Sequence, residues 1–291
     1  MDEQDWLAER FEAHRDHLRA VAYRMLGSSG EADDAVQEAW LRVSRSGADE
    51  VENLGGWLTT IVARVCLNLL EARRSRREDS LDVFVPDPIV SVDAGDPEHE
   101  AMLGDSVGLA LLLVLDTLAP SERVAFILHD VFGVPFEEIA PIVGRTPVAT
   151  RQLASRARRR VRGADEPEPD LSRQRVVVDA FMAAARDGDF VGLLAVLDPN
   201  VVLRVDAGAV VGSRLVRGAV AVAEQAIAFG RRYGAVARRV LVNGSCGIVA
   251  ADTGQAYSVL GVTVRGERIV EIDILADPER LARVDIGGLD D

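Results

Sequence analysis

A helix loaded with arginine is the part of this chain best suited to bind a polyanion. Residues 145–162 hold seven arginines and no acidic residue, although the whole chain of 291 residues carries a formal net charge of −14. Thr146 and Pro147 form a good N-cap and first-turn pair after the turn residue Gly144, so a helix is expected from Pro147. A short apolar helix from Phe136, which Pro141 should keep short, precedes it. The pattern is typical of a helix-turn-helix and predicts DNA binding; a solvated basic helix is the alternative.

The helical period divides this second helix into two flanks. Leu153, Ala154, Ala157 and Val161 share the flank expected to pack. Guanidinium forks suit phosphate oxygens and guanine edges, so the other flank is expected to face DNA. The candidate DNA-binding residues of this segment are Thr146, Arg151, Gln152, Ser155, Arg156, Arg158 and Arg159.

A second candidate surface is acidic and lies near the N-terminus. Residues 31–43 predict an amphipathic helix whose apolar positions share one side. Asp34 and Glu38 are like charges four residues apart and mildly destabilise an isolated helix, which makes sense if a basic protein surface accepts them. A merely solvated acidic face is the alternative. The candidate partner-binding residues are Asp33, Asp34, Gln37, Glu38 and Leu41.

These segments, with Trp57-Leu58-Thr59-Thr60-Ile61 between them, resemble in order and spacing an extracytoplasmic-function (ECF) sigma factor of bacterial RNA polymerase, a member of the sigma-70 family. The resemblance covers residues 1–163 and implies two all-α sigma domains. It implies that the acidic helix binds the clamp of the largest polymerase subunit, that the flap is a further contact, and that the helix-turn-helix reads the promoter −35 element. The segment after Trp57 should then meet the −10 element. Its candidate residues are Arg64, Asn68, Arg73, Arg74, Arg76 and Arg77.

The expected domain order follows from composition. Residues 78–106 contain nine acidic residues, no basic residue and three prolines, which is typical of a linker. We therefore expect sigma domain 2 over 1–78, a linker over 79–106, sigma domain 4 over 107–163, a linker over 164–170 and a further domain over 171–291. In sigma factors the corresponding linker crosses the active-site channel of the polymerase, whereas a solvated tether is the alternative here.

The C-terminal residues predict an α+β domain. Helical spacing over 171–187 and 190–197 gives way to strand patterns, with another helix over 220–233, so helices are expected to pack on a curved antiparallel sheet. The order resembles the SnoaL-like cone shared with ketosteroid isomerase. Simple alternation along residues 268–274 places the carboxylates of Glu271 and Asp273 on one face, so at least one could point inward. The candidate pocket or regulatory residues are Asp206, Tyr257, Glu271 and Asp273.

Three functions remain open at this point. The favoured one is a cytoplasmic, non-enzymatic sigma factor whose C-terminal domain contacts the sigma domains and tunes initiation. A stand-alone regulator that senses a small molecule would not need the acidic helix, and an isomerase or hydrolase would need a carboxyl group with a raised pKa in the cone. Cys66 and Cys246 lie in different domains, and the histidines lack ligand spacing, so we expect no disulfide, metal or cofactor. Residues 109–115 are too short to span a membrane, and no membrane partner is expected.

Overall fold

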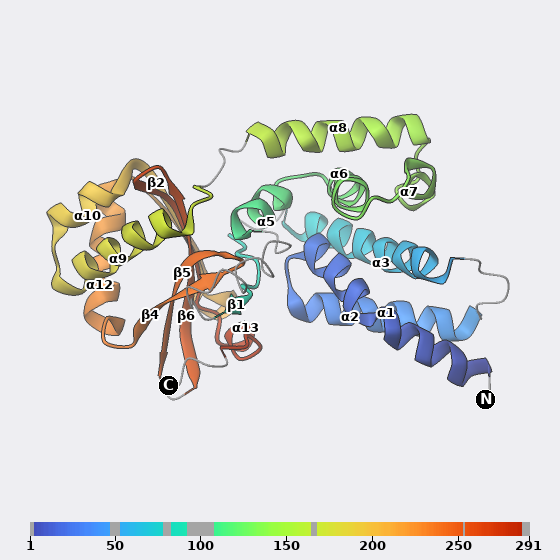
Figure 1. Cartoon of the computed structure of the whole chain (residues 1–291), viewed down its shortest axis with the longest axis horizontal. Helices are drawn as coiled ribbons and strands as arrows, with labels where there is room; N and C mark the ends of the chain where they lie inside the picture. The colour runs from blue at the N-terminus through green and yellow to red at the C-terminus, as the bar shows by residue number, and fades with distance from the viewer. Residues whose placement is uncertain are drawn as a thin grey trace. The chain divides into compact units, whose positions relative to one another are not determined.

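The computed structural model describes residues 3–46, 53–77, 83–91, 108–163, 168–252 and 254–286. The chain splits into two compact units, which are drawn in Figure 1. Residues 1–81 and 114–164 form the first unit, and residues 82–113 and 165–291 form the second. The second unit therefore includes the part of the expected linker that the structure describes.

The first unit is built from helices. Its N-terminal part has three long helices, α1 (Glu3–Leu26), α2 (Ser29–Ser46) and α3 (Leu54–Arg77). Each packs on the other two through side chains such as Phe11, Val36 and Val62, which are at most 1% exposed. Burial of these apolar faces, rather than helix propensity, is what stabilises such helices in a folded protein.

The later part of the first unit holds the helix-turn-helix. Its elements are α6 (Pro120–Phe126), a π-helical turn η2 (Ile127–Val131), α7 (Phe136–Ile142) and α8 (Pro147–Gly163), and α5 (Leu109–Asp116) precedes them. Helix α7 ends one residue after Pro141, as expected from the proline. Gly144 has φ +64° in the turn, a conformation that a side chain would strain.

The second unit is α+β. Helices α9 (Leu171–Asp187), α10 (Phe190–Val196) and α12 (Ala219–Tyr233) match the expected positions, and the short helices α11 (Gly208–Val211) and α13 (Pro278–Leu281) add to them. The strands are β1 (Val90–Ser91), β2 (Leu197–Asp206), β3 (Ser213–Arg217), β4 (Ala237–Val242), β5 (Ser245–Asp252), β6 (Gln255–Arg265) and β7 (Arg268–Leu275).

The sheet is mixed, which corrects the expectation of an antiparallel sheet. The strand order is β1-β4-β5-β6-β7-β2-β3, and β2 pairs with β7 in parallel while every other described pair is antiparallel. Strands β2 and β7 are far apart in the sequence, so no tight turn forces them to run in opposite directions. Strands β1 and β3, the two edge strands of the sheet, were not among the strands predicted from the sequence.

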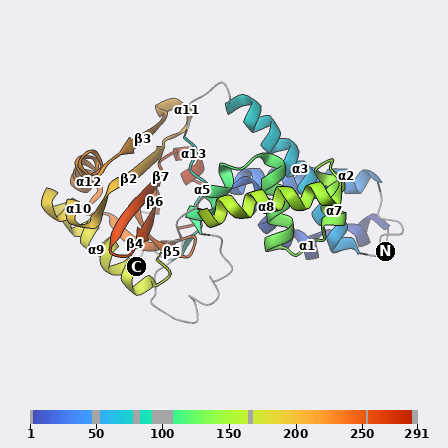
Figure 2. The same ribbon diagram turned by 90° about the horizontal axis from the view of Figure 1, so that it is seen from above.

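Each face of the sheet carries its own apolar core. Helices α9, α10 and α12 cover the face that we call the inner face, while α13 lies on the opposite side, the outer face (Figure 2). The outer core also includes Val85 from the expected linker and Leu109. Leu109 packs so closely on β6 that a Cβ at Gly261 would lie 2.2 Å from its Cδ2 atom.

Candidate nucleic-acid and protein interfaces

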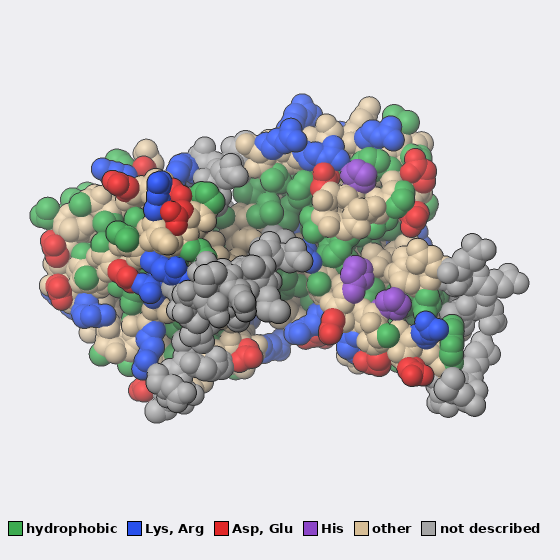
Figure 3. All heavy atoms as spheres, in the orientation of Figure 1, with side chains coloured by type: hydrophobic (Ala, Val, Ile, Leu, Met, Phe, Trp, Pro, Cys, Tyr) green, Lys and Arg blue, Asp and Glu red, His purple; other side chains and the backbone are tan. Residues whose placement is uncertain are grey.

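Helix α8 presents the arginine-rich flank that the sequence predicts. The Thr146 hydroxyl oxygen accepts a hydrogen bond from the Ala149 amide at 3.3 Å, which caps the first turn. Ala154 and Ala157 are fully buried against the rest of the unit. Arg151, Gln152, Ser155, Arg156 and Arg159 are exposed, whereas Arg158 is partly buried. Arginine side chains gather over α8 in Figure 3, so this surface suits a phosphate backbone.

Acidic residues of the same unit hold several of these arginines in place. The Arg156 Nε atom lies 2.6 Å from a Glu122 carboxylate oxygen, and Arg160 reaches the other oxygen at 3.2 Å. Arg158 pairs with Asp130 at 2.5 Å. Arg151 instead places its guanidinium 5.3 Å from the centre of the Phe136 ring. Arg151, in the N-terminal turns of α8, therefore has no acidic partner among the described residues. The N-terminal end of a recognition helix is the part that contacts base edges.

Helix α2 carries the acidic surface. Ala32, Ala35, Val36 and Ala39 are buried, and every candidate on the opposite side is exposed. The exposed candidates are Asp33, Asp34, Gln37, Glu38 and Leu41.

Two of the exposed α2 candidates have basic neighbours. Asp33 lies 2.7 Å from Arg19, and Glu38 lies 3.0 Å from Arg42, in pairs whose side chains are all at least 42% exposed. Exposed pairs of this kind contribute little stability, so a basic partner can displace them at small cost.

The candidates on α3 have different environments. Asn68 and Arg74 are exposed, but Arg73 is largely buried: it pairs with Glu31, and its Nη1 atom donates to the Leu26 carbonyl at 2.8 Å. Arg73 thus fixes α3 to α2, and this geometry does not present it to DNA. Arg64 is exposed and donates to the Pro141 carbonyl at 2.9 Å. The side chains of Arg76 and Arg77 lie outside the described residues.

By length and composition alone, α3 is apolar enough to cross a membrane from Leu54 to Ser75. Several of its apolar residues, among them Leu58, Val62 and Cys66, are fully buried in the helical unit, as in the core helix of a helical bundle. Burial also raises the pKa of the Cys66 thiol to about 12. Among the residues that the structure describes, no cluster of His, Cys, Asp and Glu could hold a metal ion.

The three acidic pocket candidates do not line the cavity of the C-terminal unit, which corrects the sequence prediction. Thr263 pairs with Glu271 but the next residue, Val264, pairs with Ile269, so Val270 is an extra residue that inverts the alternation of β7. Ile272 and Ile274 consequently line the cavity, and Glu271 and Asp273 point to the outer face. Tyr257 does line the cavity.

Arg204 pairs with the carboxylates of Glu271 and Asp273 on the outer face of the sheet. Its Nη1 atom lies 2.9 Å from Asp273 and 3.2 Å from Glu271. Asp273 is 1% exposed, and this burial raises its pKa to about 7, although Arg204 opposes the shift. This raised pKa comes from burial in the folded domain, and it does not indicate a catalytic carboxyl group, because Asp273 does not line the cavity.

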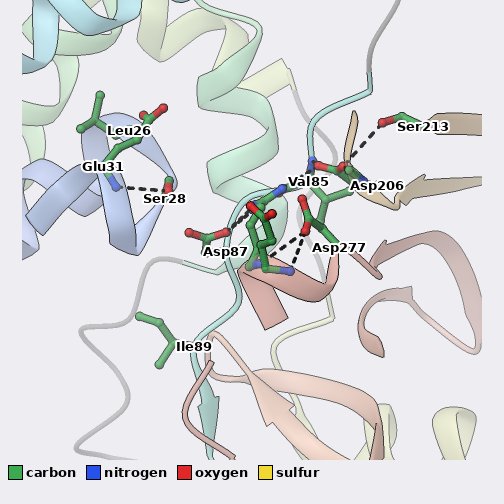
Figure 4. Close-up of polar contacts among 12 residues, drawn as sticks. Leu26, Ser28, Glu31, Val85, Asp87, Ile89, Asp206, Ser213 and Asp277 are labelled. Carbon is green, nitrogen blue, oxygen red and sulfur yellow. Dashed lines mark hydrogen bonds and ion pairs between the residues drawn. The ribbon is translucent and has the colours of Figure 1, made fainter. Parts of the chain in front are cut away.

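Asp206 is the centre of a polar cluster that was not predicted from the sequence. Its carboxylate accepts hydrogen bonds from the Val85 amide at 3.1 Å, the Arg280 guanidinium at 2.7 Å and the Ser213 hydroxyl at 3.5 Å (Figure 4). Arg280 also pairs with Asp87, and Asp206 and Asp87 are both buried. The cluster joins the segment 83–91 to β2 and α13. In the sequence it is visible only as the charged residues Asp87, Asp206 and Arg280, which lie far apart along the chain.

Comparison with known proteins decides the family. Residues 10–77 match sigma-70 region 2, and residues 108–161 match sigma-70 region 4. The chain is 36% identical over 297 residues to the probable ECF RNA polymerase sigma factor SigI of Mycobacterium tuberculosis strain H37Rv, across 99% of this chain and 100% of SigI. The chain belongs to the ECF sigma factors. It is also 35% identical over 289 residues to ECF RNA polymerase sigma factor SigJ of the same strain, across 93% of this chain and 91% of SigJ.

The likeness to solved structures includes the C-terminal unit. The crystal structure of the M. tuberculosis ECF sigma factor SigJ matches with a TM-score of 0.71 and 34% identity, over 96% of this chain and 99% of that one. This ECF sigma factor therefore carries a SnoaL-like extension, binds RNA polymerase and directs promoter-specific initiation of transcription. A free-standing regulator or an enzyme is not favoured, because SigI and SigJ resemble the chain along nearly its whole length.

Proposed function

We propose that this ECF sigma factor binds the clamp of the largest polymerase subunit through the acidic face of α2. The observation that carries this proposal is the division of α2 into a fully buried alanine face and an exposed face with Asp34 and Glu38. Carboxylates on such a face favour a basic partner and speed its encounter. The helix-turn-helix unit then contacts the polymerase flap and the promoter, and the protein acts in the cytoplasm without a cofactor.

The two promoter elements are assigned to separate surfaces. Helix α8 reads the −35 element through its exposed flank, with Thr146, Arg151, Gln152 and Ser155 nearest its N-terminus. Of the −10 candidates, Arg64, Asn68 and Arg74 are exposed on α3, and we assign the −10 contact to them rather than to Arg73.

The C-terminal domain is proposed to tune initiation by holding the linker. Residues 90–91 add a strand to β4, and the side chain and main chain of Asn243 bond the Ile89 main chain at 3.0 and 2.8 Å. Arg280 holds Asp87 and Asp206 in one buried cluster. A linker bound in this way is not free to enter the active-site channel of the polymerase, so its release should favour initiation. Regulation, rather than catalysis, is the role that these contacts support.

Run-off transcription by the reconstituted holoenzyme tests this proposal. Arg280→Ala should raise the yield because it frees the linker, and Asp87→Ala should do the same from the linker side without altering the C-terminal fold. Arg283→Ala removes an exposed arginine three residues further along and should change nothing. Equal yields from wild type, Arg280→Ala and Asp87→Ala would contradict the proposal that the held linker limits initiation.

A further inference from the structure

The C-terminal unit contains a cavity of about 310 Å³ between α12 and the inner face of the sheet. Its walls are mostly apolar and include Leu203, Val205, Leu260 and Ile272. Small-molecule sites start at roughly 300 Å³ and combine apolar walls with a few polar groups, so the cavity has the size and composition of such a site.

The charged groups of the cavity are all positive. Arg214 and Arg232 line it and are exposed, which places them at its mouth. No aspartate, glutamate or histidine is among the lining residues, and neither arginine forms an ion pair with any residue that the structure describes. Two guanidinium groups beside an apolar space favour a ligand with one anionic end.

Aromatic rings give the cavity a preferred ligand shape. Tyr233 and Tyr257 stack with ring centroids 5.7 Å apart, and Phe229 lies 5.2 Å from Tyr233. Tyr257 reaches this position because Ala250 pairs with Ser258 while Ala251 pairs with Ala256, which leaves Tyr257 as an extra residue in β6. Stacked and tilted rings complement a flat aromatic molecule better than a flexible chain.

A polar group inside the cavity lacks a partner. Ser258 lines the cavity and is 4% exposed, and its hydroxyl has no hydrogen-bond partner in the described part of the chain. An unsatisfied buried hydroxyl costs free energy, and a ligand oxygen at this place would satisfy it.

We propose that the cavity binds a small flat aromatic carboxylate that carries a hydroxyl or carbonyl group on its ring. The carboxylate pairs with Arg214 and Arg232, the ring lies among Phe229, Tyr233 and Tyr257, and the ring oxygen bonds the Ser258 hydroxyl. This binding does not depend on the proposed polymerase contacts, so the free full-length chain can be tested.

Isothermal titration calorimetry at neutral pH with three probes tests each contact. Hydroxynaphthoate has the carboxylate and the ring oxygen, naphthoate lacks the ring oxygen, and naphthol lacks the carboxylate. Wild type should bind hydroxynaphthoate at one site and more tightly than the other two. Arg214→Gln with Arg232→Gln should weaken both carboxylates about tenfold or more, as expected for a hydrogen bond to a charged group, and leave naphthol unchanged.

Two further variants make the test specific. Ser258→Ala should remove the preference for hydroxynaphthoate over naphthoate and leave the naphthoate affinity unchanged. Arg217→Gln with Arg231→Gln removes the same charge from β3 and α12 at residues outside the cavity lining, and should not alter binding. The proposal is overturned if hydroxynaphthoate shows no saturable binding, or if the two double variants weaken the carboxylates equally.

Discussion

At the residue scale, Asp273 is a buried carboxyl group whose charge depends on its surroundings. Burial raises its pKa from 3.8 to about 7, and Arg204 and Glu271 act on it in opposite directions. Between these two pH values the folded protein holds a proton that the unfolded chain has released. This proton uptake contributes its full share of the free energy of unfolding below pH 3.8, and that share is lost as the pH rises to about 7.

The variant Asp273→Asn should therefore remove a pH-dependent part of the stability of β7. Hydrogen exchange of the β7 amides, corrected for the intrinsic rate, should show protection falling with pH in wild type by at most about 1.4 kcal/mol per pH unit. In Asp273→Asn this slope should disappear, while Asp252→Asn, an exposed carboxyl group on β5, should retain it. A wild-type slope that persists in Asp273→Asn would assign the proton to another group.

At the element scale, α8 combines arginines that are held by acidic neighbours with others that are exposed. Arg156, Arg158 and Arg160 pair with acids of α6 and η2, which positions α8 on its own unit. Arg151 lies one turn into the helix and rests on the Phe136 ring, so its guanidinium is held near the N-terminal end. Residues at this end of a recognition helix contact base edges.

The variant Arg151→Ala should therefore lose promoter discrimination. With holoenzyme and a promoter that it transcribes, the ratio of run-off product from the intact to the scrambled −35 element should fall about tenfold, the scale of roughly 1–3 kcal/mol for one base contact. Arg162→Ala removes the same charge from the last turn and should lower both yields without changing their ratio. Unchanged discrimination in Arg151→Ala would exclude this residue from base recognition.

The elements also show how far the sequence predicts the structure. The start of α8 and the exposed side of α2 followed from local signals, the cap at Thr146 and the spacing of buried alanines. The orientation of Glu271 and Asp273 could not be predicted in this way. Val270 is an extra residue that reverses which side chains of β7 face inward, and this bulge is set by the pairing of β7 with β6. The parallel pairing of β2 with β7 and the Arg280 cluster likewise arise from contacts between distant parts of the chain.

At the scale of the whole molecule, the two surfaces that we propose to bind DNA belong to one compact unit. Arg64 of α3 donates to the Pro141 carbonyl of α7, and the His17 ring meets Phe132 edge-on at 5.4 Å. If α3 and α8 bind the separate −10 and −35 elements together, as we propose, we expect the hydrogen bond from Arg64 to Pro141 to open first. The net charge of −14 opposes approach to DNA, and polymerase binding is expected to overcome this repulsion.

The most direct test of the central claim is co-elution of the purified full-length chain with core RNA polymerase at modest ionic strength. We predict that wild type co-elutes and that Asp34→Arg with Glu38→Arg does not, because the α2 surface then repels its basic partner. Arg151→Ala should still co-elute, since α8 is assigned to DNA. Co-elution of the charge-reversed variant at the wild-type level would contradict the assignment of α2 to the polymerase clamp.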